Sequence, residues 1–190
     1  MAKIYLHAGL PKTGTTTIQN WLAENAANLR KVGIFTFPES GLAHRLAVDS
    51  ITLPKRLAQP DIPLIMSWSL EDARSALKQA RDDPEINVIV LSSEYFSEAS
   101  PESVKLAFAD LSLSDVAVMF ILRRQDRLLE SGYSQSVKEM AWTDPLRSPH
   151  YNPNYDWYRL ASSWSAVFGR DNIILRSYDE IVASGEPLIP

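Results

Sequence analysis

The sequence predicts an α/β domain with a mostly parallel central sheet and helices on both of its faces. Three observations carry this prediction. Short apolar runs alternate along the chain with segments of helical periodicity, as they do in βαβ units. Two of these runs, 85–93 and 115–123, are almost continuously apolar, which is typical of strands buried on both faces. A loop with two glycines joins the first apolar run, 3–9, to the first helical pattern.

The remaining elements follow in order from the same patterns. A second strand is expected at 33–37, closed by Pro38, and a last strand at 172–179. The proline-bearing segments 38–68 and 143–154 show little clean periodicity, although 40–48 has the pattern of a short helix. The predicted helices are one that starts at Thr15 and ends shortly before Gly33, one capped by Ser69, one over 100–111 capped by Ser100, one over about 125–140, and one over 156–169.

Composition narrows the class of protein. A chain of 190 residues is the size of one domain, so we expect a single domain over 1–190. The net charge of −4 gives no overall basic field for nucleic acid or an anionic membrane, and any anion site must therefore be local. The absence of cysteine excludes disulfides and zinc–thiolate sites. No apolar run has the length of a membrane span and the N-terminus makes a poor signal peptide, which predicts a cytoplasmic protein.

The loop after the first strand has the features of a phosphate-binding loop. Gly9 and Gly14 have the spacing of the nucleotide triphosphatase loop G-x-x-x-x-G-K-[ST], but Thr15 stands where that loop has its lysine. The nearby lysine is Lys12, inside the loop. Backbone N–H groups of such a loop, together with the following helix N-terminus, converge on an anion. The alternative interpretation is a plain strand–helix connection whose threonines cap the helix.

The run GLPKTGTTTIQ resembles the 5′-phosphosulfate loop of the sulfotransferases that use 3′-phosphoadenosine 5′-phosphosulfate (PAPS), and most of all their bacterial members of uncertain substrate. The resemblance implies a P-loop NTPase-like sulfotransferase fold, PAPS as donor, 3′,5′-adenosine bisphosphate (PAP) as product, and no metal. Lys12 would then lie near the bridging oxygen between phosphate and sulfate and stabilise charge on the leaving phosphate. The residues that would hold the 5′-phosphosulfate with it are Thr13, Gly14, Thr15, Thr16 and Thr17.

A second signature belongs to the same resemblance. The family holds the 3′-phosphate of its donor with an arginine at a strand end and a serine eight residues later on the next helix. The sequence ILRRQDRLLES offers Arg123 and Ser131 at that spacing, with Arg124 as the alternative arginine. Arginine suits the role because its guanidinium presents a fork of donors to phosphate. The alternative interpretation is that these arginines are solvated and pair with Asp126 and Glu130.

Transfer to a hydroxyl or an amine needs a base that takes the proton of the acceptor. Glu94 is the first candidate, because it directly follows a predicted strand and so lies at the edge where parallel sheets bind ligands. Its alternative interpretation is a carboxylate favoured by a helix N-terminus. His44, in the irregular segment 38–68, is the second candidate, and His7 is expected to pack in the core.

The sequence thus predicts a PAPS-dependent sulfotransferase whose acceptor is a small molecule or a carbohydrate. Two other functions stay open. A P-loop kinase or NTPase with a displaced lysine would bind ATP with magnesium. A module that binds PAP or PAPS without catalysis is the other alternative, because relatives usually carry a later glycine-rich and basic lid segment, which this chain is expected to lack.

Overall fold

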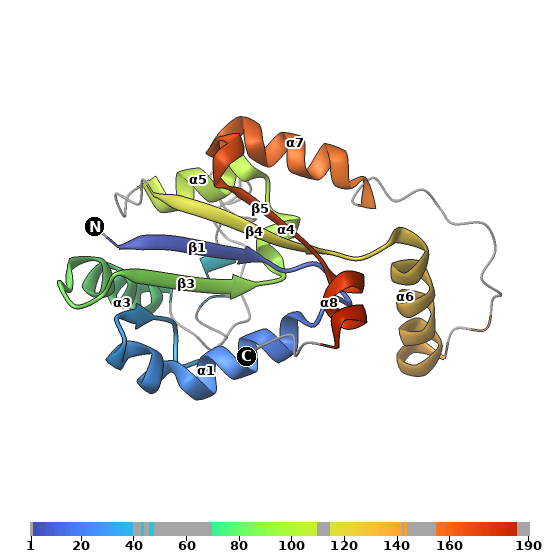
Figure 1. Cartoon of the computed structure of the whole chain (residues 1–190), viewed down its shortest axis with the longest axis horizontal. Helices are drawn as coiled ribbons and strands as arrows, with labels where there is room; N and C mark the ends of the chain where they lie inside the picture. The colour runs from blue at the N-terminus through green and yellow to red at the C-terminus, as the bar shows by residue number, and fades with distance from the viewer. Residues whose placement is uncertain are drawn as a thin grey trace, which may run out of the picture.

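The computed structural model describes residues 2–39, 43, 46–47, 70–109, 115–141, 143 and 155–185. Within these residues the strands form a single sheet in the order β2-β3-β1-β4-β5, and every neighbouring pair is parallel (Figure 1). The predicted α/β class is therefore confirmed, with an all-parallel sheet. The five strands are β1 (Lys3–Ala8), β2 (Ile34–Phe35), β3 (Val88–Ser93), β4 (Val116–Leu122) and β5 (Ile173–Ser177).

Helices cover both faces of this sheet. Figure 1 shows α1 on one side and α5 with α7 on the other, whereas α6 and α8 lie beyond the carboxyl ends of the strands. None of the helices in the described part of the chain is both long and apolar enough to cross a lipid bilayer. The α-helices described are α1 (Thr15–Lys31), α3 (Leu70–Asp82), α4 (Tyr95–Glu98), α5 (Pro101–Ala109), α6 (Gln125–Met140), α7 (Trp157–Phe168) and α8 (Tyr178–Ser184).

The central strands are buried on both faces, as their continuous apolar pattern predicts. Along β4 both sides of the strand are covered, and Phe120 packs edge-on against Trp164 of α7 with 5.3 Å between ring centroids. This contact fixes α7 on the sheet and sets the position where α7 begins, close to the carboxyl end of β4. The buried side chains of β4 are Val116, Ala117, Val118, Phe120 and Ile121.

Several element boundaries test the sequence predictions. The Ser100 cap is confirmed, because its Oγ accepts the N–H of Ser103 at 3.1 Å. The predicted strand over 33–37 pairs with β3 only at Ile34 and Phe35. The last strand was predicted too long: it ends at Ser177, whose Oγ accepts the N–H of Glu180 at 3.2 Å and so caps the unpredicted helix α8. Ser69 lies outside the described residues.

Candidate functional site

Three loops predicted to form the site start side by side at one edge of the sheet. Strand β1 lies between β3 and β4, and all three strands are parallel, so the segments that follow them leave the sheet at the same edge. The N–H of Gly9 donates to the carbonyl of Ser93 at 3.0 Å, which continues the ladder past the last paired residues. The loop at 9–14, the turn at Glu94 and the turn at Arg123 are therefore neighbours.

The phosphate-like loop is held in shape by its own threonines. The hydroxyls of Thr13 and Thr15 both donate to the carbonyl of Leu10, at 2.7 Å and 3.1 Å, and both side chains are buried. The side chain of Thr15 also lies over Gly9, where an added Cβ would collide with it. A glycine is thus required at position 9, and the residue that replaces the kinase lysine is part of the fold of the loop.

The loop ends in a glycine cap that leaves donors available. Gly14 has a φ of 79° and is the N-cap residue of α1, so none of the threonines occupies the cap position that the alternative interpretation gave them. Ile18 donates its N–H to the carbonyl of Gly14 at 3.1 Å, and the N–H groups before it in α1 precede the first helical bond. Thr16 and Thr17 on this first turn are exposed. The helix start therefore presents backbone and hydroxyl donors to solvent.

Lys12 has an unusual backbone conformation at the centre of this loop. Its φ of 63° lies in the left-handed region that residues other than glycine seldom adopt. Its carbonyl accepts a hydrogen bond of 2.9 Å from Nη1 of Arg123, the arginine at the end of β4. This bond joins the two segments predicted to bind the two ends of the donor, which are 111 residues apart in the sequence.

Arg123 is the better anchored of the two candidate arginines. Its guanidinium lies 5.1 Å from the centre of the Tyr178 ring, and its carbonyl accepts the indole N–H of Trp157 at 3.0 Å. Its Nε is buried and has no hydrogen-bond partner among the described residues. Trp157 and Tyr178 were not predicted as part of the site, although each begins a helix at the carboxyl edge of the sheet.

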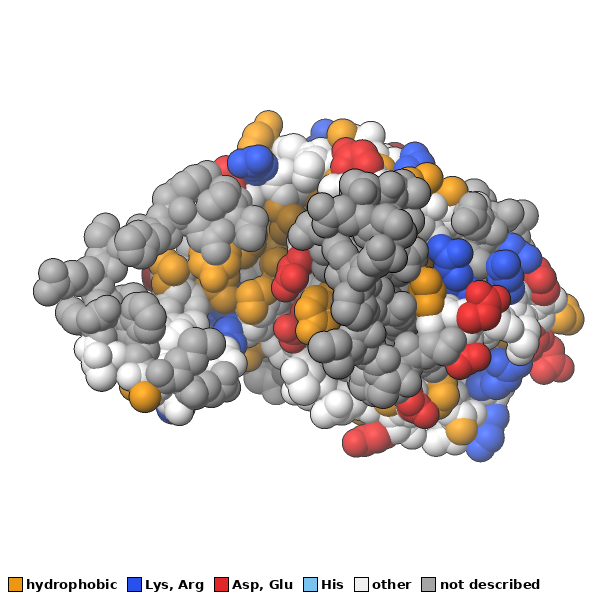
Figure 2. All heavy atoms as spheres, turned by 180° about the vertical axis from the view of Figure 1, so that it is seen from behind, with side chains coloured by type: hydrophobic (Ala, Val, Ile, Leu, Met, Phe, Trp, Pro, Cys, Tyr) orange, Lys and Arg blue, Asp and Glu red, His pale blue; other side chains and the backbone are white. Residues whose placement is uncertain are grey.

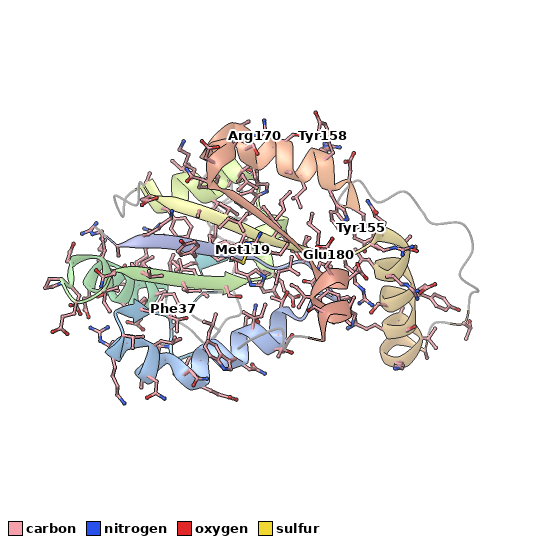
Figure 3. The ribbon with its side chains drawn as sticks, in the orientation of Figure 1. Phe37, Met119, Tyr155, Tyr158, Arg170 and Glu180 are labelled. Atoms are coloured by element: carbon pink, nitrogen blue, oxygen red, sulfur yellow. The ribbon has the colours of Figure 1, made fainter. Side chains whose placement is uncertain are left out.

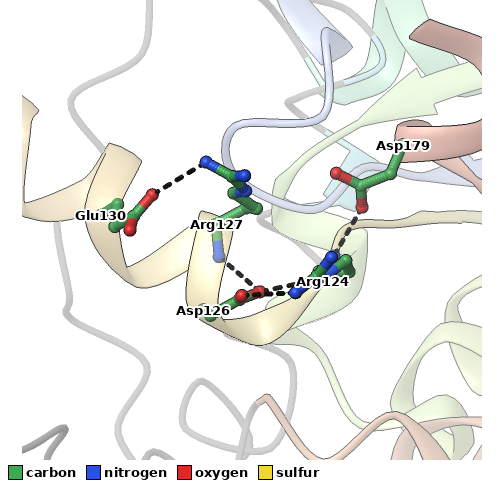
Figure 4. Close-up of polar contacts among 5 residues, drawn as sticks. All are labelled: Arg124, Asp126, Arg127, Glu130 and Asp179. Atoms are coloured by element: carbon green, nitrogen blue, oxygen red, sulfur yellow. Dashed lines mark hydrogen bonds and ion pairs between the residues drawn. The ribbon is translucent and has the colours of Figure 1, made fainter. Parts of the chain in front are cut away.

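Arg124 and Arg127 instead agree with the alternative interpretation, in which the arginines are solvated and pair with acidic side chains. Figure 4 shows the guanidinium of Arg124 paired with Asp126, at 2.7 Å, and Arg127 reaching Glu130, at 3.5 Å. The backbone N–H of Arg124 donates to Asp179 at 2.8 Å, which ties the start of α6 to α8. These exposed pairs contribute little stability. They leave Arg123 as the arginine whose side chain is directed toward the phosphate-like loop.

A cavity of about 400 Å³ opens beside Arg123, between the carboxyl ends of β4 and β5 and the first residues of α6, α7 and α8. Figure 3 shows Tyr155 and Glu180 at this end of the molecule. Figure 2, seen from behind, shows hydrophobic side chains in the hollow between α6 and the rest of the protein. The cavity is within the size range of small-molecule sites. Its lining residues are Leu122, Arg123, Arg124, Gln125, Trp157, Leu175, Arg176, Ser177, Asp179 and Glu180.

Glu94 is the cap residue of the short helix α4, directly after β3. Its carboxyl is half-buried, and burial is the largest cause that raises its pKa above the ordinary value. The charge of Glu98 raises the pKa further, and the charge of Lys12 lowers it. The influence of Lys12 indicates that the candidate base and the phosphate-like loop are electrostatically close. The helix-cap interpretation also holds for its place in the chain, but its side chain makes no capping hydrogen bond.

We predict that Glu98→Gln lowers the pKa of Glu94. The two carboxylates are four residues apart across the single turn of α4 and so lie on one side of it. Removing the charge of Glu98 removes one of the two causes that raise this pKa, so Glu94 stays ionised to lower pH. Carbon-detected NMR titration of the Glu94 carboxyl measures the shift. Glu102→Gln, an equal charge change on the first turn of α5, should leave the titration unchanged, and an equal response in both variants would contradict the prediction.

His7 packs in the core, as predicted. It is 4% exposed, and its Nδ1 lies 2.8 Å from Oγ of Ser92, the residue opposite it on β3. Burial lowers the pKa of His7 from 6.5 to about 4, because the charged imidazolium would lose its hydration there. His7 is therefore neutral at pH 7 and is not a candidate for phosphate binding through charge.

We predict that His7 makes the protein less stable in mild acid. The unfolded chain binds the proton with a pKa of 6.5 and the folded protein with a pKa of about 4, so the free energy of unfolding is highest above pH 6.5 and falls as the pH drops toward 4. The loss amounts to about 3 kcal/mol by pH 4, at ~1.36 kcal/mol for each pKa unit. Urea unfolding of the wild type and His7→Asn between pH 7 and pH 4 measures it. If both proteins lost stability equally, the assignment of this slope to His7 would be wrong.

The structure says less about the two remaining candidate residues, Ser131 and His44. Ser131 lies on α6 and is half-buried. His44 lies outside the described residues, so its position relative to Glu94 stays a prediction. Among the described residues, no three histidine or acidic side chains gather in a way that could hold a metal ion.

Comparison with known proteins adds to this geometry. By structure, the chain is similar to the crystal structure of the sulfotransferase from Alicyclobacillus acidocaldarius, with a TM-score of 0.56 over 97% of this chain and 76% of that one. This chain has the fold of a sulfotransferase. The two sequences are 16% identical, a level at which the likeness shows the fold alone.

Sequence comparison is less informative. No family model matches the chain. An uncharacterized protein of Archaeoglobus fulgidus is 31% identical over 93 residues, which cover 48% of this chain and 25% of that protein. The chain thus spans about a quarter of the length of the curated relative that it matches.

Proposed function

We propose that this protein is a PAPS-dependent sulfotransferase that acts on a hydroxyl or an amine. The observation that carries the proposal is the hydrogen bond from Arg123 to the carbonyl of Lys12, because it brings two anion-binding segments together at the carboxyl edge of the sheet. The sulfotransferase fold and the position of Glu94 at the same edge support it.

The side chains at this edge fit such a donor. The free N–H groups and hydroxyls at the start of α1 suit a 5′-phosphosulfate, because a helix N-terminus favours negative charge. The buried Nε of Arg123 has no partner among the described residues, as expected of a guanidinium that awaits an anion. In this proposal Arg123 and Ser131 hold the 3′-phosphate, and Lys12 with the amides of 13–17 holds the 5′-phosphosulfate.

PAPS supplies the activated sulfuryl group. The side chains of this protein supply the base and the positive charge that the transfer needs. Glu94 accepts the proton of the acceptor hydroxyl or amine, and its raised pKa makes it a stronger base once it is ionised. Lys12 carries the positive charge that balances the charge developing on the leaving phosphate. Thr15 has its side chain buried against Leu10, so this position does not offer the group that reaches the γ-phosphate in a kinase loop.

Calorimetric titration with PAP tests the proposal. We expect PAP to bind without magnesium and to bind more tightly than ATP with magnesium, because the site offers two separate monophosphate positions. Binding of ATP with magnesium, and none of PAP at millimolar concentration, would favour the kinase or NTPase alternative. Binding of PAP with no sulfuryl transfer to a broad panel of hydroxyl and amine acceptors would favour the non-catalytic module.

We predict that Arg123→Ala weakens PAP binding about 10- to 100-fold, since a hydrogen bond to a charged group contributes ~1.5–3 kcal/mol. The 3′-phosphate does not change its charge during transfer, so the loss should appear mainly in donor affinity and less in kcat. Arg124→Ala is the matched control, because its guanidinium already pairs with Asp126. If Arg124→Ala weakened PAP binding more than Arg123→Ala, the 3′-phosphate would belong to Arg124.

A further inference from the structure

A cluster of buried polar side chains lies directly beneath the candidate site. Its members are His7 on β1, Gln19 on α1, Ser92 on β3 and Thr36 just after β2, and each is between 4% and 7% exposed. Polar side chains at this depth are normally hydrogen-bonded. One hydrogen bond joins two of them, between Nδ1 of His7 and Oγ of Ser92, 2.8 Å apart.

Gln19 is left without a partner for its amide. Its Nε2 is buried and makes no hydrogen bond with the described residues. The same side chain borders a small space of about 10 Å³ between α1 and the sheet. That volume is close to the minimum that holds one water molecule, and the polar residues among those that line it are Gln19, Thr36 and Ser92. The residues that line it are Gln19, Leu22, Thr36, Phe37, Ala43 and Ser92.

The residues on the two sides of this small space lie on elements that lead to the two parts of the candidate site, the loop of Lys12 and the turn of Glu94. Gln19 lies on the helix that starts at the phosphate-like loop, five residues after Gly14. Ser92 stands two residues before Glu94, on the strand that leads to the candidate base. His7 lies opposite Ser92 on β1, two residues before Gly9. Any bridge across the gap therefore ties the loop of Lys12 to the turn of Glu94.

We propose that one water molecule occupies this space, accepts the N–H of Gln19 and donates to Oγ of Ser92, and thereby holds the phosphate-like loop and the Glu94 turn at a fixed separation. The water serves Gln19 and Ser92, whereas the buried Nε2 of His7, which also has no partner among the described residues, is not part of this bridge. The hydroxyl of Ser92 donates to Nδ1 of His7 and keeps its lone pairs for the water. Gln19, Ser92 and His7 are positioning residues here, since none of them needs to touch the donor. The binding of the water is independent of the proposed function, and the effect on turnover rests on it.

A high-resolution crystal structure of the wild type tests the water directly. We expect density for one water within hydrogen-bond distance of Nε2 of Gln19 and Oγ of Ser92. A dry cavity, or a Gln19 amide bonded to protein instead, would overturn the proposal. This result does not depend on whether the protein binds PAP.

The positioning role is tested with Gln19→Met, which keeps the length of the side chain but removes its donor, and with Asn20→Met as the exposed control on the next residue. In crystal structures we expect Gln19→Met to lose the water and to shift the Glu94 turn relative to Lys12, with no shift in the control. In kinetics we expect a fall in kcat of about 10-fold, with KM for the donor nearly unchanged. An unchanged loop–turn separation, or unchanged kcat in an enzyme that does bind PAP, would overturn the positioning role. Failure of PAP to bind the wild type would instead contradict the proposed function.

Discussion

Replacing Lys12 with alanine should lower kcat about 10²- to 10³-fold while changing the affinity for PAP much less. The reason is that a charge beside the bridging oxygen gains importance as negative charge develops on the leaving phosphate, and loss of one such electrostatic contact typically has an effect of that size. Single-turnover kinetics with PAPS, together with calorimetry for PAP, separate the two quantities.

The structure makes this substitution informative. The contact from Lys12 to Arg123 uses the backbone carbonyl, so Lys12→Ala keeps it while removing the ammonium group. Alanine and lysine also carry a similar cost at a φ of 63°, whereas Lys12→Gly would relax the backbone as well. Lys12→Gln serves as the control that keeps most of the side-chain volume. If Lys12→Ala left kcat intact and raised only the KM for PAPS, Lys12 would be an ordinary phosphate anchor.

The sequence predicted the sheet and the helices that pack on it, because these elements carry strong patterns. The continuous apolar runs of β3 and β4 and the capping Ser100 are local signals, and the structure agrees with them. Helices α4 and α8 were missed because they have four and seven residues, too few to show a period. Ser177 is a capping residue that could have indicated where β5 ends and α8 begins.

The sequence predicted the segments that form the site but not the contacts between them. The glycine spacing and the displaced lysine mark the loop, but nothing local indicates that Arg123 reaches the carbonyl of Lys12 across 111 residues. The inward direction of the Thr13 and Thr15 hydroxyls is equally invisible in the sequence, because it depends on the turn made by Leu10. Tyr178 was placed in a strand, so its ring beneath Arg123 was not anticipated.

Glu94→Gln should reduce kcat by about 10²- to 10⁴-fold, the usual contribution of a general base, with little change in the affinity for PAP. Glutamine keeps the size of the side chain and cannot take the proton of the acceptor. In the wild type the rate should fall as the pH drops through the pKa of Glu94, since only the ionised carboxylate accepts a proton. Burial and the charge of Glu98 raise that pKa, so the fall should begin at a higher pH than for an ordinary glutamate.

The pH–rate profile then decides between the two candidate bases. In Glu94→Gln the residual rate should no longer depend on pH in the acid range, and in Glu98→Gln the whole acid limb should move to lower pH with kcat at its plateau nearly retained. His44→Ala should keep both the plateau and the limb. If Glu94→Gln instead kept its rate and its acid limb, and His44→Ala lost both, the proton of the acceptor would go to His44, and the raised pKa of Glu94 would reflect only its half-buried place beside Glu98.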